Sequence, residues 1–199
     1  MWLLLALTAR AEAPETPTGM AGHFQDAALM MLAVAVDDKK AARAHTKSLA
    51  TSDVAPAPLR EAAQDLLGSL GKAERAGPAV ADLVGACAKC HLAGGRGPEP
   101  TEVSEVPGAS AVDRHVMASM FVWIGLVTPL EQPYALGLDA LVRDLDTNSN
   151  DAVRASAETF HTLVLNAKAA RSWAERRDKF GTMLPACVEC HELAGATFR

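Results

Sequence analysis

One five-residue pattern occurs twice in this chain of 199 residues. It reads CAKCH from Cys87 to His91 and CVECH from Cys187 to His191, and the two copies use all four cysteines. Cysteines three positions apart on a helix lie on one side of it, and a histidine directly after the second cysteine shares that side. Any fold of this chain must therefore bring two thiols and an imidazole together at two places.

This spacing is typical of covalent attachment of c-type haem, in which two thiols bond to the porphyrin and the histidine binds the iron. A disulfide, a zinc site and a redox-active cysteine pair are the alternatives. A structural zinc site does not require a histidine directly after each pair, and a redox pair usually lies in a βαβ pattern, which is absent here. We therefore expect two haem c groups, attached at Cys87, Cys90 and His91 and at Cys187, Cys190 and His191.

The rest of the chain predicts an all-α fold, because aromatic residues are only 5% and β-branched residues do not alternate. Apolar residues spaced three and four apart predict helices. The expected helices are 18–36, 39–50, 58–76, a fourth after a break at Gly77-Pro78 that ends at Gly94, 112–127, 133–145, 150–169 and 172–194, with Pro185 kinking or restarting the last. These form two tandem up-down-up-down four-helix bundles, 17–96 and 112–199, joined by a linker at 97–111 that is rich in Pro, Gly, Ser and Glu.

The amino terminus and the overall charge suggest where the protein works. Residues 1–11 combine an apolar run with a small-residue cleavage pattern, which predicts a signal peptide and a periplasmic or otherwise exported protein. The formal net charge of −5 gives no support to a nucleic-acid role. It favours redox partner proteins that present a basic docking surface.

Only eight residues follow His191, and none of them is His or Met. A second protein ligand for that iron must therefore come from upstream, which excludes the order in which a methionine follows the haem motif. In this respect the chain resembles the class II, or cytochrome c′, family, in which a four-helix bundle carries CxxCH on its last helix. The resemblance covers nearly the whole mature chain as two copies, and it implies that the first helix of each bundle faces the distal side of the haem.

Aligning MAGHFQDAAL with VDRHVMASMF matches His23 with His115, whereas no methionine matches. We therefore expect His91 and His23 to bind the first iron, and His191 and His115 the second. The family offers methionine or a non-coordinating residue on this face, so the departure argues against simple gas binding. Met20 is the substitute ligand at the first iron, and His45 and His161, which have no counterparts, are expected to be ordinary surface or core residues.

An iron with two histidine ligands has no open coordination position, so the expected function is electron transfer and not catalysis. The alternatives are a gas-binding or peroxidase-like haem protein with an open distal site, and a haem subunit of a larger oxidoreductase. The segment Val116 to Val127 is apolar almost all round. We expect it to be covered by contact between the bundles, with a homodimer seam as the alternative; it is too short for a membrane span.

Overall fold

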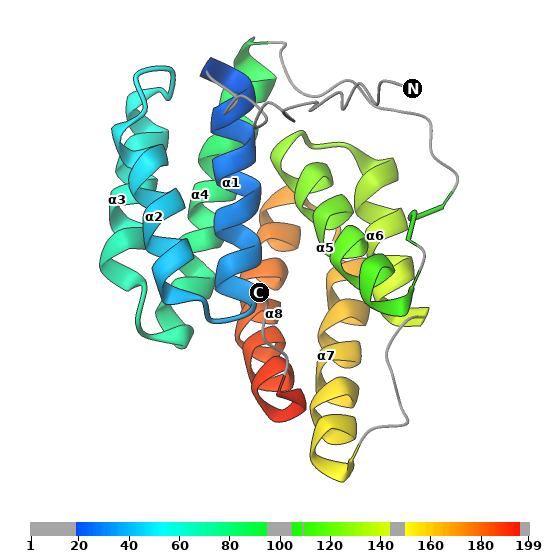
Figure 1. Ribbon diagram of the computed structural model, residues 1–199. Helices are drawn as coiled ribbons and strands as arrows, with labels where there is room; N and C mark the ends of the chain where they lie inside the picture. Colours follow the sequence, from blue (N-terminus) through cyan, green and yellow to red (C-terminus); the bar gives the residue numbers. More distant parts are fainter. Residues whose placement is uncertain (1–18, 95–104, 109, 144–149, 196–199) are drawn as a thin grey trace, which may run out of the picture.

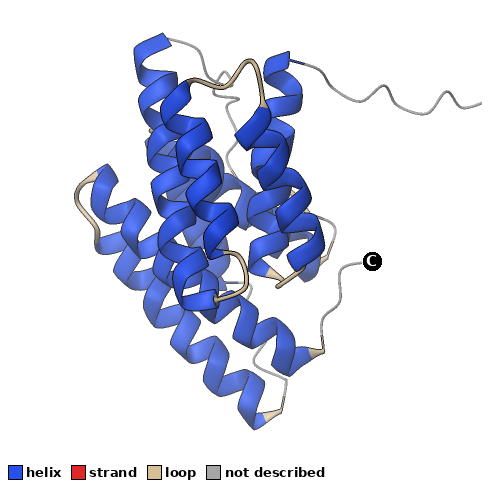
Figure 2. Cartoon of the chain, turned by 90° about the vertical axis from the view of Figure 1, so that its left-hand side faces the viewer, coloured by secondary structure: helices blue, strands red, loops and turns tan. Residues whose placement is uncertain are grey.

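The computed structural model describes residues 19–94, 105–108, 110–143 and 150–195, apart from the side chains of Met20, Ala73, Ala111 and Val112. These ranges contain eight helices and no strand (Figures 1 and 2), which confirms the all-α prediction. The helices are α1 (Gly19–Ala35), α2 (Lys39–Thr51), α3 (Ala57–Ser69), α4 (Ala73–Gly94), α5 (Ala111–Val127), α6 (Glu131–Arg143), α7 (Asp151–Ala169) and α8 (Trp173–Ala194). The predicted signal peptide at 1–11, most of the predicted linker and the Met20 side chain lie outside what is described.

The helices form two groups that meet along one seam. Within α1 to α4 and within α5 to α8, each helix packs against the next one along the chain. The seam joins α4 to α8, the two helices that carry the cysteine motifs, and they run in opposite directions (Figure 1). A Cβ atom added to Gly77 would lie 2.2 Å from the carbonyl oxygen of Gly181. The absence of side chains at these two positions therefore allows the two helix backbones to approach so closely.

The predicted helix break at Gly77-Pro78 was wrong. Helix α3 ends at Ser69 and α4 begins at Ala73, and the turn between them contains Gly71 with a φ of +124°. Gly77 is required for close helix packing rather than for a turn, and Pro78 lies exposed inside the early part of α4. Pro185 likewise lies inside α8 and does not restart it.

The first helix of each group packs differently from a closed up-down-up-down bundle, where it would lie along the fourth helix. Among the described residues, α1 and α4 make few or no close backbone contacts, and α5 meets α8 only marginally. Instead α1 contacts α8, and α5 contacts α4. Each first helix therefore crosses to the motif-bearing helix of the other group.

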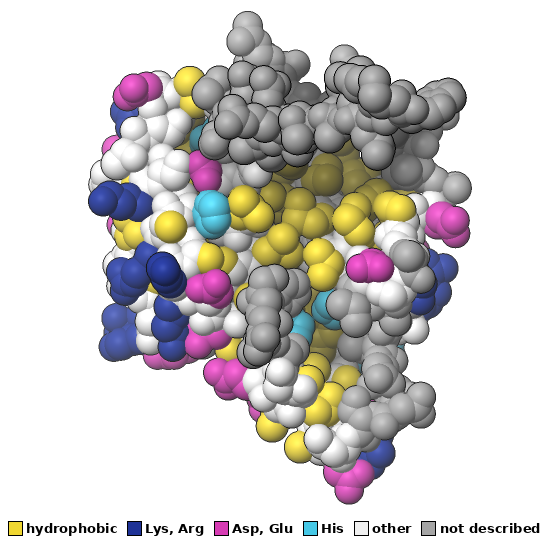
Figure 3. Space-filling view, in the orientation of Figure 1, with side chains coloured by type: hydrophobic (Ala, Val, Ile, Leu, Met, Phe, Trp, Pro, Cys, Tyr) yellow, Lys and Arg dark blue, Asp and Glu magenta, His cyan; other side chains and the backbone are white. Residues whose placement is uncertain are grey.

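The apolar helix α5 is covered mainly by other parts of the same chain. Its residues Val122, Trp123 and Leu126 are fully buried, and it packs against α6 and α4. Met117 and Met120 remain partly exposed, and hydrophobic side chains gather along the centre of the face shown in Figure 3, with histidines at the border. None of the described helices has the length and hydropathy needed to cross a bilayer.

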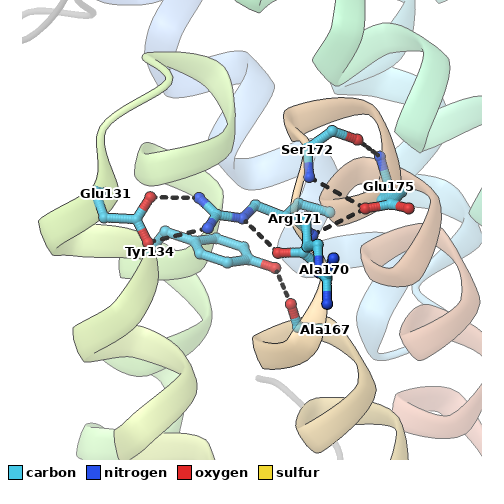
Figure 4. Close-up of polar contacts among 8 residues, drawn as sticks. Glu131, Tyr134, Ala167, Ala170, Arg171, Ser172 and Glu175 are labelled. Carbon is cyan, nitrogen blue, oxygen red and sulfur yellow. Dashed lines mark hydrogen bonds and ion pairs between the residues drawn. The ribbon is translucent and has the colours of Figure 1, made fainter.

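A polar and aromatic cluster fixes α6, α7 and α8 to one another (Figure 4). The Ser172 and Glu175 side chains form a capping box at the start of α8. Arg176 binds Glu131 of α6 and lies over the Tyr134 ring, 4.8 Å from its centre. The Tyr134 hydroxyl donates to the Ala167 carbonyl of α7 at 2.9 Å, and Arg176 of α8 donates to the Ala170 carbonyl at the end of α7 at 3.3 Å, so all three helices are joined.

Candidate functional site: two matched histidine pairs

The two cysteine motifs lie at opposite ends of the α4–α8 seam. Cys87 is ten positions after Gly77, and Cys187 is six positions after Gly181. At about 1.5 Å of rise per residue, the antiparallel helices separate Cys87 from Cys187 by roughly 24 Å and Cys90 from Cys190 by roughly 33 Å along the seam. The four cysteines therefore cannot share one metal, and no group of three or more His, Cys, Asp or Glu residues suited to a metal ion occurs in the described ranges.

Burial raises the pKa of three of the four thiols. Burial raises the pKa of Cys87 and of Cys187 to about 12, and the neighbouring cysteine of each pair adds to the effect. Part of the Cys187 side chain is nevertheless accessible to solvent. Burial also raises the pKa of Cys190, against a smaller opposing effect of Ser156. Because redox-active cysteines have lowered pKa values, the raised pKa values of Cys87, Cys187 and Cys190 do not favour a redox pair, and no disulfide joins the four cysteines.

The first site joins α4, α1 and the end of α5. His91 is half-buried in the last turn of α4, and its Nδ1 donates to the Val127 carbonyl oxygen at 2.7 Å. Because a carbonyl oxygen only accepts hydrogen bonds, Nδ1 carries the proton and Nε2 keeps its lone pair. His23 of α1 has a lowered pKa, caused first by burial and then by electrostatic repulsion from the nearby His91, with Asp26 opposing. Its imidazole is therefore neutral at neutral pH.

His23 also lacks a hydrogen bond that a buried ring nitrogen would normally make. Its Nδ1 atom is buried and has no hydrogen-bond partner among the described residues. Buried polar atoms nearly always have a partner, so an exception requires an explanation. A neutral, half-buried imidazole with a buried Nδ1, near a second imidazole with an available Nε2, is a donor set that suits a transition-metal ion.

The second site repeats this arrangement with α8, α5 and the end of α1. The Nδ1 of His191 donates to the Ala35 carbonyl oxygen at 3.0 Å. The ring centre of His115 lies 6.0 Å from that of His191, with an angle of 76° between the planes, and 6.3 Å from that of Phe160. With metal–nitrogen bonds of about 2.0 Å, two imidazoles on one metal ion have ring centres about 6 Å apart. The His115–His191 spacing fits such a pair.

The predicted ligands are thus brought together in the predicted combinations, His23 near His91 and His115 near His191. His45 instead pairs with Asp26 at 2.8 Å, and His161 is half-buried on α7. Sequence reasoning missed the carbonyl groups of Ala35 and Val127. One signal was present: each lies twelve positions after the matched histidine of its own helix.

No family model matches the chain, and no curated protein or solved structure matches it. The resemblance to the cytochrome c′ family therefore stays a prediction that rests on the repeated motif and the helix plan. The functional conclusion has to come from the two sites themselves.

Proposed function

We propose that the protein is a dihaem c-type cytochrome that carries electrons. The observation that carries the proposal is the repetition: at both sites a histidine from a first helix meets the histidine of a CxxCH motif. Two such meetings in one chain are difficult to explain by chance packing. A single site with ordinary core histidines would not have a matched copy.

Each CxxCH segment would hold its haem through two thioether bonds, formed when the two thiols add across the two vinyl groups. When bound, the haem iron supplies a one-electron couple between the ferric and ferrous states. The raised pKa values of Cys87, Cys187 and Cys190 suit this role, because the sulfur atoms would serve as covalent anchors and not as metal ligands. Two attached haems are proposed, one at Cys87 and Cys90 and one at Cys187 and Cys190.

The histidines would act as the axial ligands. The hydrogen bond from Nδ1 to a backbone carbonyl fixes the tautomer and the ring orientation of His91 and His191 and makes Nε2 a stronger donor. The proposed opposite ligands are His23 and His115. Two imidazoles leave no open coordination position, and they favour lower reduction potentials than a His/Met pair.

The two proposed haems would lie within one small molecule. His23 and Ala35 are twelve positions apart on α1, a rise of about 18 Å, and His115 and Val127 are equally spaced on α5. Because Ala35 and Val127 contact the other site's histidine, the sites are on the order of 20 Å apart. We further propose two cytochrome c′-like units at 17–96 and 112–199, export to the periplasm, and partners with a basic surface that fits the charge of −5.

One observation favours a second candidate at the first site. A hollow of about 410 Å³ next to His23 is also lined by Asp26, Ser48 and Asp53. If His23 did not bind the iron, it would be a distal imidazole beside a polar hollow, as in a gas-binding or peroxidase-like protein. A haem subunit of a larger oxidoreductase would have the same sites as the carrier and differ only in its partner.

Optical spectra of the matured protein test the proposal. We expect low-spin bands in the ferric and ferrous states that do not change when carbon monoxide is added. A high-spin ferrous spectrum that shifts with carbon monoxide would support the open-site alternative. His23→Ala and His115→Ala should each make one of the two haems reactive; if both variants keep the low-spin spectrum of the native protein, the assigned distal ligands are wrong.

A further inference from the structure

Helices α1 and α5 end in the same kind of hydrogen-bonded turn. At the end of α1, the Asp38 N–H donates to the Ala33 carbonyl at 2.9 Å and the Asp37 N–H to the Val34 carbonyl at 3.3 Å. Asp37 has a φ of +53°, in the left-handed region. This is the Schellman arrangement, which satisfies carbonyl groups that the helix leaves without intrahelical partners.

The end of α5 has a corresponding hydrogen bond. The Leu130 N–H donates to the Gly125 carbonyl at 3.0 Å, and Pro129 lies where α1 has Asp37. Proline has no N–H, so the second bond of the arrangement cannot form there. The two helices nevertheless end in a turn closed by the same wide hydrogen bond, at the same distance from their matched histidines.

In both turns the carbonyl of the last helical residue points to a partner in the other half of the chain. The Ala35 carbonyl accepts from His191, and the Val127 carbonyl accepts from His91. A helix C-terminus carries a partial negative charge, which strengthens a bond from an imidazole N–H. The exchange is reciprocal, because each half supplies the acceptor for the motif histidine of the other.

We propose that the carbonyl groups of Ala35 and Val127 are positioning groups for the axial histidines of the opposite halves, so that each haem site is completed by both halves. This inference rests on the proposed function. Helix α1 would supply the distal ligand of the first site, His23, and hold the motif histidine of the second site. Helix α5 would do the same in reverse with His115.

A substitution at the end of α1 or α5 should change the haem site of the opposite half. Loss of the bond to Val127 weakens Nε2 of His91 as a donor and frees its ring to rotate, which raises the reduction potential of the first haem. The affected site lies in the half opposite to the substitution. A merely local disturbance would change the site of its own half instead.

Proline substitutions in the full-length haem protein test this. Thr128→Pro disfavours the helical conformation of Val127 and turns its carbonyl away from His91, and Val36→Pro does the same to Ala35. Thr128→Ala and Val36→Ala are the matched controls, because they change the same side chains and leave the preceding residue free to stay helical.

Each proline is read out in a background with one intact histidine pair. With His115→Ala present, the first site gives the remaining bis-histidine signal. Its potential should rise and its low-spin electron paramagnetic resonance should change with Thr128→Pro, but not with Val36→Pro or either control. With His23→Ala present, Val36→Pro alone should change the second site. If each proline acts on its own half's site, or on neither, the inference is overturned.

A measurement on the unsubstituted protein covers the case in which the proline variants do not fold. In the ferrous, ¹⁵N-histidine-labelled protein, the Nδ1–H protons of His91 and His191 should exchange with deuterium roughly tenfold or more slowly than those of a free imidazole. Exchange at the free rate would overturn the inference. A protein that lacks two haems contradicts the proposed function, whereas two haems without the crosswise effect contradict this inference alone.

Discussion

The two sites share one plan but have different surroundings. At the first site, Asp26 of α1 lies near His23, and it binds His45 and Ser48 of α2. At the second site, the position that corresponds to Asp26 is Ala118, which is fully buried. His115 there contacts the Phe160 ring. A carboxylate and a hollow adjoin one pair, whereas apolar groups adjoin the other.

If both sites hold haem as proposed, this difference would give one architecture two different redox centres. Asp26 favours the charged form of His23, since it opposes the lowering of that pKa. The same negative charge would stabilise the extra positive charge of a ferric iron. We expect the first haem to have the lower potential and the second, in its apolar surroundings, the higher.

The largest expected effect is the reaction with carbon monoxide after removal of each distal histidine. Both His23→Ala and His115→Ala should change one haem from unreactive to reactive. Association should be faster in His23→Ala, because the vacated space adjoins the hollow near Asp26, whereas Phe160 borders the other. Flash photolysis measures both rates, and equal rates would remove the proposed difference in access.

The second-largest effect is expected at the seam between α4 and α8, the two helices that carry the cysteine motifs. Gly77→Ala would place a methyl group against the Gly181 backbone and should destabilise the protein by about 1–3 kcal/mol. Gly68→Ala is the control, since a Cβ there meets nothing within 4 Å, and it should be neutral or stabilising. Chemical denaturation measures both changes. Equal stability of the two variants would show that the seam does not need this close contact.

A smaller effect is expected from the charge that distinguishes the sites. Asp26→Asn should raise the reduction potential of the first haem, by an amount that corresponds to a free energy on the order of 1 kcal/mol. The potential of the second haem should stay almost unchanged. Asp65→Asn, on the exposed side of α3, is the control. Potentiometric titration followed optically resolves the two couples. A larger shift at the second haem would reverse the assignment of low and high potential.

The smallest effect concerns the cluster that only the second half has. Tyr134→Phe removes the hydrogen bond to the Ala167 carbonyl and should cost about 1 kcal/mol of unfolding free energy. The corresponding position in the first half is Ala42, which has no such bond to lose. Thermal and denaturant unfolding should detect the change, while the haem spectra stay as they were. An altered haem spectrum would mean that the Tyr134 cluster also influences the geometry of the second site.

The sequence predicted the helical class, most helix ends and the histidine pairs, because periodicity and the duplicated motif are local signals. It failed at Gly77, where a glycine that permits helix contact was read as a turn, since the two requirements have the same local pattern. A contact of α5 with the other bundle was expected, but the reciprocal crossing of α1 and α5 to the motif-bearing helices of the opposite halves was not predicted. It depends on backbone carbonyl groups, such as those of Ala35 and Val127, which every residue type carries.

The central claim is that each half of the protein holds its own covalently attached porphyrin. The intact mass of the matured, denatured protein tests it directly. We expect the mass of two haems, and of one haem after Cys87→Ser with Cys90→Ser or after Cys187→Ser with Cys190→Ser. A native protein with fewer than two haems, or a double-serine variant that keeps both, would contradict the account.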